Sequence, residues 1–386
     1  MVRGRDFFVL ADDWSGLPTA TAHLFRQLAP QNRIFAVNLL TRLPRPTRGD
    51  ARAVGRTVQR WFRPSSARAA PATTGPAREQ NVWATTAVTI PWFTPAVRRL
   101  NCTSLGHHFR RVQRTHGLQD PIVFTTLPCA ADFVARVKHH PKIYFCLDDW
   151  AHYPGLDNRA FARMEADLIA SVDGFAATSR ALLTKGAGRQ ASLYLPHGVD
   201  LEHFHRPDRA YVPVAALEQL PRPIVGFFGL LAEWVDLELI AAASRRFPQV
   251  SFVLLGKPAV GLQMLAGRSN VHHLGVVPYR ELPDYARYFD VGIIPFVADR
   301  LTQAVNPLKL LEYFALGLPV VATGLPELRD AAGPVFVAAG EDQFCDRLAE
   351  VLRQPRAHAA EAVAVARRNT WAQRAELLSE FLEQLG

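Results

Sequence analysis

The sequence predicts an α/β protein made of two parallel-sheet domains. Short apolar segments and helical patterns alternate along almost all of the 386 residues, and this alternation is typical of parallel sheets covered by helices. The length fits two domains of ordinary size. The hydrophobic content of 49% and the charged content of 20% are those of a folded globular protein.

The expected elements follow from these patterns in chain order. In the first half, strands are expected at 6–11, 34–39, 86–90, 122–126, 142–147, 174–178 and 192–195, and helices at 19–28, 97–116, 129–138 and 160–171. In the second half, strands are expected at 224–228, 250–255, 271–274, 290–294, 319–322 and 334–337. The helices between them are expected at 236–247, 259–267, 281–288, 307–316 and 341–353.

These elements predict a first domain at 1–200 and a second domain at 223–368. The segment between them, 201–222, is rich in proline and is expected to be a linker and surface. The chain ends in a helical stretch within 369–386.

Residues 42–80 form an insertion of a different composition. Residues 42–78 contain nine arginines and one acidic residue, Asp50. A basic amphipathic helix is expected over 51–63, with one stripe of Val54, Val58, Trp61 and Phe62 and another of Arg52, Arg56 and Arg60. This pattern is typical of an interfacial membrane helix. The alternative is a surface helix packed on its own domain.

The formal net charge of +9 predicts an anionic partner, either a phosphorylated substrate or an anionic membrane surface. No nucleic-acid-binding motif accompanies the charge, so no nucleic acid is expected. The four cysteines lie far apart, so neither a disulfide framework nor a zinc ribbon is expected. No signal peptide or apolar run long enough to span a membrane is recognised. We expect a cytoplasmic protein, with peripheral contact to the inner face of the plasma membrane as an extension.

The stretch 306–323, NPLKLLEYFALGLPVVAT, carries the clearest chemical signal. Asn306 and Pro307 suit the cap and first position of a helix, and Gly317 suits its end. Lys309, beside backbone N–H groups at a helix start, can hold phosphate oxygens. One turn on, Glu312 can accept hydrogen bonds from a ribose diol. The stretch therefore predicts a nucleotide diphosphate site; the alternative is that both charges form a solvated surface pair.

A second polar group follows the strand expected at 142–147. Asp148 and Asp149 come directly after it, and His152 lies three residues further on. Carboxylates and a histidine at the carboxyl end of a parallel strand lie where α/β enzymes place their chemistry. Successive aspartates in an extended segment point in opposite directions, so we expect one of them to face the substrate. The alternative is that both residues cap turns or the next helix.

The loop after the first strand contains Asp13, Trp14 and Gly16. Its single glycine does not match a dinucleotide-binding fingerprint. We therefore expect this loop to form a substrate edge on the acceptor side.

Six segments in order resemble the GT-B glycosyltransferases, in particular bacterial family-4-like enzymes of polysaccharide assembly. They are the loop 12–16, YFCLDDW at 144–150, VDGFAATS at 172–179, LPHGVDLEHF at 195–204, IVGFFGLLAEWVDLELI at 224–240 and NPLKLLEYFALGLPVVAT at 306–323. The start Pro307-Leu308-Lys309 is also similar to that of membrane-associated glucuronosyltransferases of exopolysaccharide synthesis.

The resemblance implies two Rossmann-like domains facing across a cleft, with the last helix crossing back to the first domain. The second domain would bind a nucleotide sugar and the first the acceptor. Lys309 would contact the diphosphate and Glu312 the ribose hydroxyls, while Val277 and nearby backbone would meet the base. The other donor-binding positions are Asn306, Pro307 and Leu308 at the helix start and Gly229 after the first strand of this domain.

Two departures from the family accompany these matches. Family-4 enzymes usually carry a second glutamate eight positions before the one matched by Glu312, and Ala304 stands there. The loop 229–236 also lacks the basic residues that usually grip the diphosphate. Lys309 is therefore expected to be the principal cation on the phosphates.

The resulting hypothesis is transfer of a hexosyl or glucuronosyl group from a nucleoside-diphosphate sugar, with UDP favoured, to a glycan or lipid-linked acceptor in cell-surface polysaccharide synthesis. No cofactor or metal is expected, because the adjacent histidine pairs do not face one point. Asp149 is favoured as the base over Asp148, with His152 in reserve. Two other functions stay open: a GT-B relative that epimerises or hydrolyses a nucleotide sugar, and a non-catalytic scaffold that binds glycan or membrane.

Overall fold

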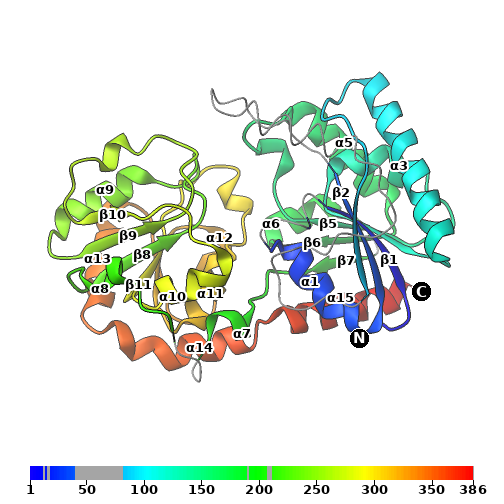
Figure 1. The fold of residues 1–386 in the computed structure, drawn as a ribbon. Coiled ribbons are helices and arrows are strands. Elements are labelled where there is room, and N and C mark those ends of the chain that lie inside the picture. Colours follow the sequence, from blue (N-terminus) through cyan, green and yellow to red (C-terminus); the bar gives the residue numbers. More distant parts are fainter. Residues whose placement is uncertain (12–13, 15–17, 40–80, 189–190, 207–210, 386) are drawn as a thin grey trace. The chain divides into compact units, whose positions relative to one another are not determined.

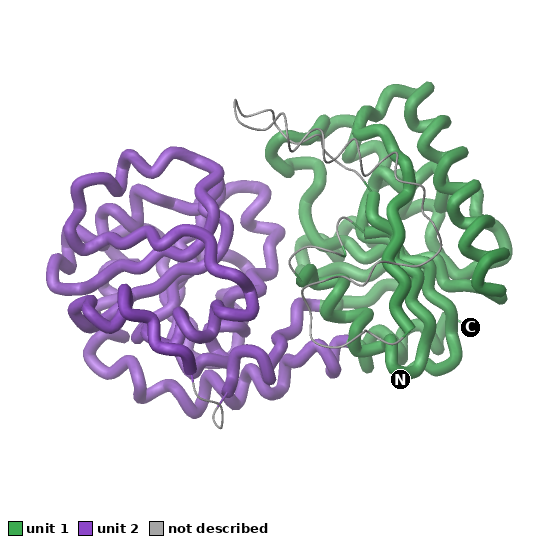
Figure 2. Tube along the Cα trace, viewed as in Figure 1, with its two compact units in different colours: residues 1–195, 375–386 green, residues 196–374 purple. Residues whose placement is uncertain are grey.

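A computed structural model of the chain describes residues 1–11, 14, 18–39, 81–188, 191–206 and 211–385. The chain divides into two compact units (Figure 2). Unit 1 comprises residues 1–195 and 375–386, and unit 2 comprises residues 196–374. Each unit contains a fully parallel sheet with helices on it, which confirms the predicted α/β class (Figure 1). The basic helix predicted over 51–63 lies outside the described residues.

Unit 1 is built on a seven-stranded sheet in the order β3-β2-β1-β4-β5-β6-β7. Its strands are β1 Asp6–Ala11, β2 Arg33–Asn38, β3 Val82–Thr86, β4 Ile122–Thr125, β5 Lys142–Cys146, β6 Gly174–Ala177 and β7 Ser192–Tyr194. Its α-helices are α1 Ala20–Leu28, α3 Pro95–His116, α4 Ala131–Val134, α5 Asn158–Ser171 and α6 Arg180–Leu183. Successive strands are added on one side of β1 up to β3 and on its other side from β4 on. Side chains at this switch point between β1 and β4 can meet a ligand.

Unit 2 is built on a six-stranded sheet in the order β10-β9-β8-β11-β12-β13. Its strands are β8 Ile224–Phe228, β9 Ser251–Leu255, β10 Val271–His273, β11 Val291–Ile294, β12 Val320–Thr323 and β13 Val335–Ala338. Its α-helices are α7 Leu201–Phe204, α8 Ala215–Glu218, α9 Leu237–Arg246, α10 Leu282–Ala286, α11 Lys309–Ala315, α12 Pro326–Arg329, α13 Glu341–Leu352 and α14 Ala359–Arg367. The switch point of this sheet lies between β8 and β11.

The last helix, α15 Trp371–Leu385, belongs to both units. At its start, the backbone N–H of Trp371 donates to the carbonyl of Val199 at 3.3 Å. From residue 375 on, the helix packs on unit 1, where a Cβ on Gly174 would lie 2.8 Å from both Phe381 and Leu385. The predicted final helix thus ends on the first sheet.

Three expected elements differ from the structure. The segment 201–222, expected to be a linker, belongs to unit 2 because Phe204 and Leu217 are buried in its core. The helix expected at 259–267 is only a short 3₁₀ turn at Gln263–Leu265, since Gly261 and Gly267 on either side disfavour a longer helix.

The third strand lies at Val82–Thr86 instead of 86–90. Asn101 of α3 takes the place of a neighbouring strand beside Ile90. Its Oδ1 accepts from the Ile90 N–H and its Nδ2 donates to the Ile90 carbonyl, both at 2.8 Å. This side chain satisfies the backbone that a longer strand would have paired. Among the described residues, no helix combines the length and hydrophobicity needed to cross a bilayer.

Candidate functional site

Helix α11 is fixed to the sheet of unit 2 by Tyr313, whose side chain is fully buried. Gly226 and Gly292 face each other across β8 and β11, and a Cβ on Gly292 would lie 2.6 Å from the Tyr313 ring. The Tyr313 hydroxyl lies 3.3 Å from the Gly226 carbonyl and accepts from the Phe228 N–H at 3.3 Å. The ring therefore fills space that only glycine leaves open, and the start of α11 is held at the carboxyl ends of β8 and β11.

Lys309 begins this helix and points its ammonium group between two aromatic rings. Its Nζ lies 5.7 Å from the centroid of Phe227 in β8 and 5.8 Å from that of Phe296, just after β11. Within the described residues, no carboxylate forms an ion pair with this ammonium group. Burial lowers the pKa of Lys309, although the charge of Glu312 opposes the shift. A desolvated cation in this state is suited to bind an anion.

Glu312 lies one helical turn further on and is 8% exposed. Burial raises the pKa of its carboxyl from 4.5 to about 7; the charge of Lys309 opposes this shift and that of Asp200 adds to it. Asp200 itself caps α7 by accepting from the His203 N–H at 3.1 Å. Glu312 is therefore a carboxyl group that lacks enough internal donors and can accept hydrogen bonds from a ligand.

Glycines line the loops that follow β8, β9 and β10. The N–H of Gly229 donates to the carbonyl of Leu255 at 2.8 Å, and that of Gly256 donates to the carbonyl of Gly275 at 2.6 Å. Gly229 and Gly256 have φ angles of +140° and +144°, which favour glycine. A Cβ on Gly229 would collide with Cε of Lys309. These loops bring backbone close to Lys309, and we call Lys309, Glu312, Gly229 and Gly256 the Lys309 site.

The remaining residues predicted around this site have other positions. Asn306 does not cap α11: the helix begins at Lys309 after Leu308, and no side chain caps it. Pro307 and Leu308 lie between Asn306 and the start of the helix, so the Asn306 side chain is not at the cap position. Its Nδ2 donates instead to Glu327 at 3.2 Å. Val277 is partly buried against the core of unit 2, two residues after Gly275.

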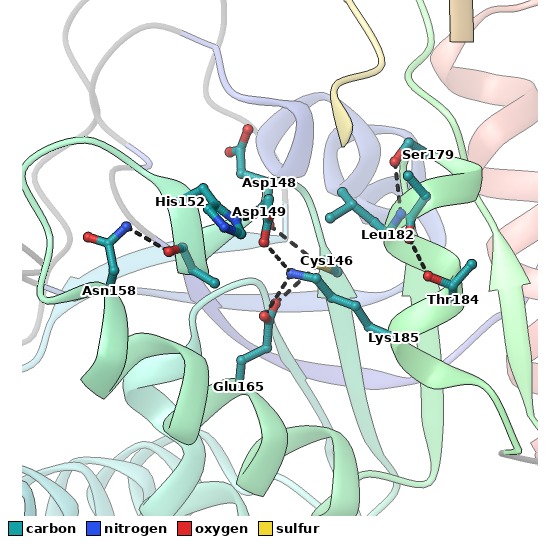
Figure 3. Close-up of polar contacts among 12 residues, drawn as sticks. Cys146, Asp148, Asp149, His152, Asn158, Glu165, Ser179, Leu182, Thr184 and Lys185 are labelled. Atoms are coloured by element: carbon teal, nitrogen blue, oxygen red, sulfur yellow. Dashed lines mark hydrogen bonds and ion pairs between the residues drawn. The ribbon is translucent and has the colours of Figure 1, made fainter. Parts of the chain in front are cut away.

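Unit 1 contains a cluster of buried charges after β5 (Figure 3). Asp149 accepts from His152 Nδ1 at 2.6 Å with one carboxylate oxygen and from Lys185 Nζ at 2.8 Å with the other. Figure 3 shows the Asp148 carboxylate pointing away from Lys185, as expected for successive residues of an extended segment. Burial alone would raise the pKa of Asp149, but the bonds from Lys185 and His152 hold it below its ordinary value.

The Lys185 ammonium group is shared with a second carboxylate, Glu165 of α5, at 2.8 Å. The other oxygen of Glu165 accepts from the Tyr144 hydroxyl at 2.6 Å and lies 3.4 Å from the sulfur of Cys146. Burial alone would lower the pKa of Lys185, but Cys146, Glu165 and Asp149 raise it. We call Tyr144, Cys146, Asp149, His152, Glu165 and Lys185 the Asp149 cluster.

This cluster leaves one nitrogen of His152 available. Nδ1 faces Asp149, and the side chain is 39% exposed. No partner of Nε2 is seen in the described part of the chain. A histidine that donates Nδ1–H to a carboxylate can take a proton at Nε2. The arrangement can therefore act as a general base, with Asp149 holding the imidazole in the required tautomer.

The loop after β1, which was predicted to form a substrate edge, is only partly described. Trp14 is buried, its ring centroid is 6.5 Å from that of Phe25, and its backbone N–H donates to Asn38 at 2.8 Å. These contacts point to a structural role for its ring. Asp13 and Gly16 lie outside the described residues.

Sequence reasoning missed Glu165, Lys185, His197 and Asp200. Glu165 gave a signal, because it falls on the buried stripe of α5 together with Phe161, Met164 and Leu168; a charged residue there needs a buried partner. His197 and Asp200 lie in the segment PHGVD, which gave no chemical signal beyond that of a connection. Burial lowers the pKa of His197 to about 4, with Arg374 and Lys309 adding to the shift.

The described residues contain no group of three or more His, Cys, Asp or Glu side chains arranged to hold a metal ion. The Asp149 cluster instead meets its buried carboxylates with the ammonium group of Lys185. The Lys309 site offers one ammonium group to an anion, and this group pairs with no carboxylate among the described residues.

Residues 222–354 match the family model described as Glycosyl transferases group 1. Curated relatives match parts of the chain. TuaH of Bacillus subtilis strain 168, whose name provisionally assigns it to teichuronic acid biosynthesis as a glycosyltransferase, is 34% identical over 148 residues, or 36% of each chain. The UDP-glucuronate:glycolipid 2-beta-glucuronosyltransferase of Xanthomonas campestris pv. campestris is 28% identical over 208 residues, or 52% of this chain and 48% of the relative. The matches thus span half or less of these relatives.

Solved structures match nearly the whole chain. Sucrose-phosphate synthase from Thermosynechococcus elongatus has a TM-score of 0.69 and 14% identity, with 99% of both chains covered. HepE from Anabaena, in complex with UDP and glucose, has a TM-score of 0.64 and 16% identity, with 98% of this chain and 99% of HepE covered. These similarities confirm the predicted GT-B fold and the predicted resemblance to glycosyltransferases.

Removing the Lys185 charge is expected to destabilise unit 1. In Lys185→Met, Asp149 and Glu165 would face each other without a cation. A fully buried carboxylate that loses its partner costs about 3–5 kcal/mol; because 24% of the Lys185 side chain is exposed, we expect about 2–3 kcal/mol at pH 8. Chemical denaturation of the full chain measures this loss. It should shrink at pH 5, since protonation of either carboxylate removes the repulsion.

Lys142→Met is the matched control, because Lys142 lies at the start of β5 and is only partly buried. Equal unfolding free energies for the wild type and Lys185→Met at pH 8 would contradict the assignment.

Proposed function

We propose that the protein is a glycosyltransferase that moves a sugar from a UDP-sugar to a hydroxyl group of a glycan or lipid-linked acceptor in cell-surface polysaccharide synthesis. The observation that carries the proposal is the Lys309 site. It joins a desolvated cation, which has no ionic partner among the described residues, to a carboxyl group whose pKa is raised to about 7. The site lies at the switch point of a parallel sheet, within the segment that matches Glycosyl transferases group 1.

Each part of the Lys309 site has a role toward the donor. The Lys309 ammonium group meets the diphosphate oxygens, and backbone near Gly229 and Gly256 approaches them closely. The Glu312 carboxylate accepts hydrogen bonds from the ribose hydroxyls. Val277 and adjacent backbone meet the base. Because positive charge at Lys309 also stabilises the departing diphosphate, the site assists bond cleavage without a metal ion.

Relatives support the choice of donor and acceptor class. One curated relative is named for transfer from UDP-glucuronate to a glycolipid, and another for teichuronic acid biosynthesis. HepE, which has a similar fold, was solved with UDP and glucose. A lipid-linked acceptor would bring the protein to the inner face of the plasma membrane.

We assign the base to His152, with Asp149 as its positioning partner. Transfer with inversion requires a group that takes the proton of the acceptor hydroxyl. Sequence reasoning favoured Asp149, but both of its oxygens are occupied and its pKa is lowered. Nε2 of His152 remains accessible, so this nitrogen takes the proton and Asp149 stabilises the resulting imidazolium.

The direct test is a thermal-shift panel of nucleotide sugars, followed by release of UDP with and without acceptor glycans. We expect UDP-sugars to raise the melting temperature, because a ligand that binds only the folded state stabilises it. Donor turned over to an epimer or hydrolysed without acceptor would favour an epimerase or hydrolase. No binding of any nucleotide sugar would favour a scaffold.

Lys309→Met is expected to weaken UDP binding about 10–100-fold, because one hydrogen bond to a charged group contributes about 1.5–3 kcal/mol. Calorimetry with UDP measures the loss. Folding should be unaffected or improved, since the variant no longer buries this cation. Lys142→Met in unit 1 is the control and should bind UDP as the wild type does. Unchanged UDP affinity in Lys309→Met would remove Lys309 from the donor site.

Glu312→Gln is expected to raise the unfolding free energy at pH 8 and to leave it unchanged at pH 4. The pKa of Glu312 is about 7 in the folded state, against an ordinary value of 4.5 that applies to the unfolded chain. The folded state therefore binds more protons between these values, and stability falls as pH rises from 4.5 through 7. The stability lost corresponds to about 3 kcal/mol. Denaturation at several pH values measures the effect.

The same substitution should lower UDP affinity at pH 8 and remove the rise in affinity across pH 7 that ionisation of Glu312 causes. Glu376→Gln, at an exposed position of α15, is the control for both measurements. An unfolding free energy of the wild type that does not fall between pH 5 and pH 8 relative to Glu312→Gln would contradict the raised pKa.

His152→Ala is expected to reduce turnover about 100–10,000-fold, which is the range for loss of a general base. Asp149→Asn should also reduce turnover, because a neutral amide at this position would no longer fix the tautomer of His152. UDP affinity should be unchanged in both variants. Steady-state kinetics from pH 5 to pH 9 measure the effect, and His152→Ala with normal turnover would return the role of base to another group.

A further inference from the structure

Unit 1 contains a cavity of about 330 Å³ away from the Asp149 cluster. It is lined by side chains within residues 102–113 of α3 and within residues 133–140, the segment that leads into β5. The Asp149 cluster follows the carboxyl end of β5, whereas this segment precedes its amino end. The cavity therefore lies toward the amino end of β5, whereas the Asp149 cluster lies at its carboxyl end. We call it the α3 cavity.

The α3 cavity is strongly basic. Arg110, Arg136 and Lys138 line it, and none of its lining residues is Asp or Glu. Within the described residues, no carboxylate forms an ion pair with any of these three cations. Asp132, the acid nearest in sequence to Arg136 and Lys138, accepts from Arg98 at 2.8 Å with both of its oxygens. Asp120, the acid nearest in sequence to Arg110, contacts His140 at 2.9 Å. The cavity therefore presents three cations whose charge the described carboxylates do not neutralise.

Two polar side chains of the cavity, Arg110 of α3 and His140, have defined positions. A Cβ on Gly106 would lie 3.6 Å from Nη1 of Arg110, so the Arg110 guanidinium lies back along the helix beside this glycine. His140 is held by Asp120, 2.9 Å from its Nδ1, and by the Gln113 amide nitrogen, 3.5 Å from its Nε2. Glycine in the middle of a helix costs stability, and here it leaves room beside a guanidinium group.

The floor of the cavity is apolar and rigid. Phe109 and Phe133 are nearly fully buried, and their ring centroids lie 5.7 Å apart in an edge-to-face arrangement. Both rings contact Phe8 of β1, in the interior of unit 1. The floor therefore keeps its shape when the rim is filled, and it offers an apolar surface to the body of a ligand.

We propose that the α3 cavity binds a phosphate ester with a small organic body, at a site separate from the transfer reaction. Guanidinium groups match phosphate oxygens in geometry and charge. The volume is at the lower end of the range for small-molecule sites, about 300–1,000 Å³. The apolar floor accommodates the organic body while the rim cations meet the phosphate. A soluble sugar phosphate and the headgroup of an anionic phospholipid both have this chemistry.

The experiment uses the full chain carrying Lys309→Met, so that the Lys309 site does not contribute to phosphate binding. One arm measures binding of glycerol 3-phosphate by calorimetry. The other measures sedimentation with vesicles of phosphatidylglycerol in phosphatidylcholine, compared with vesicles of phosphatidylcholine alone. Binding of glycerol 3-phosphate identifies a soluble ester, and binding only to the phosphatidylglycerol vesicles identifies a lipid headgroup; each result supports the proposal when the variants below abolish it.

Two pairs of variants place the binding in the cavity. The double change Arg110→Gln and Arg136→Gln should weaken binding at least about 10-fold. Arg99→Gln with Arg114→Gln removes the same charge from exposed positions of α3 that do not line the cavity, and it should change binding less than about 3-fold. Gly106→Leu should occlude the cavity and abolish binding, whereas Gly106→Ala should retain it.

If neither probe binds, or if both arginine pairs weaken binding equally, the proposal is overturned. Circular dichroism of Gly106→Leu shows whether α3 still forms. Should that variant not fold, the comparison of the two arginine pairs decides the outcome alone.

Discussion

The Lys309 site depends on how the Tyr313 ring packs between α11 and the sheet of unit 2. The space for this ring exists because Gly292 has no side chain, and its neighbour Gly226 on β8 leaves similar space for the Phe289 ring. The Tyr313 hydroxyl forms hydrogen bonds with backbone groups of β8, so it also fixes the position of α11 along this strand. Without this packing, the ammonium and carboxyl groups of the first turn of α11 would have no fixed position relative to the glycine loops.

The two charged sites show different uses of burial. In the Asp149 cluster, one ammonium group serves two carboxylates, and a tyrosine hydroxyl and a histidine complete the bonds. Such a network costs desolvation but fixes geometry, because every charge has an internal partner. In the Lys309 site, charges are desolvated without such partners among the described residues. The first arrangement orients His152, whereas the second leaves an ammonium and a carboxyl group able to bind a ligand.

The sequence predicted the fold well, because strands buried on both faces give continuous apolar runs that end in glycine or acidic residues. It singled out Lys309, Glu312, Asp149 and His152 as candidates for a similar reason, because these polar residues come after predicted strands. It did not find Lys185 or the contacts that occupy both oxygens of Asp149. Those depend on which side chains meet in space, and no periodicity places Lys185, in a short turn after α6, against a carboxylate of α5. The prediction that Asn306 caps the helix was wrong, because two further residues precede the start of α11 at Lys309.

The absence of an ion pair between Lys309 and Glu312, both described residues, decides what their site can do. Neighbours on one helical turn often pair, yet here the ammonium group lies between two phenylalanine rings and the carboxyl group lies near Asp200. Burial lowers the pKa of Lys309 and raises that of Glu312, so it favours the neutral form of each group. A ligand with phosphate oxygens and hydroxyl donors opposes both shifts, because it supplies an anion to the ammonium group and hydrogen bonds to the carboxylate. Folding has already removed both groups from water. A ligand that supplies these partners therefore gains the interaction energy without a rearrangement of the protein.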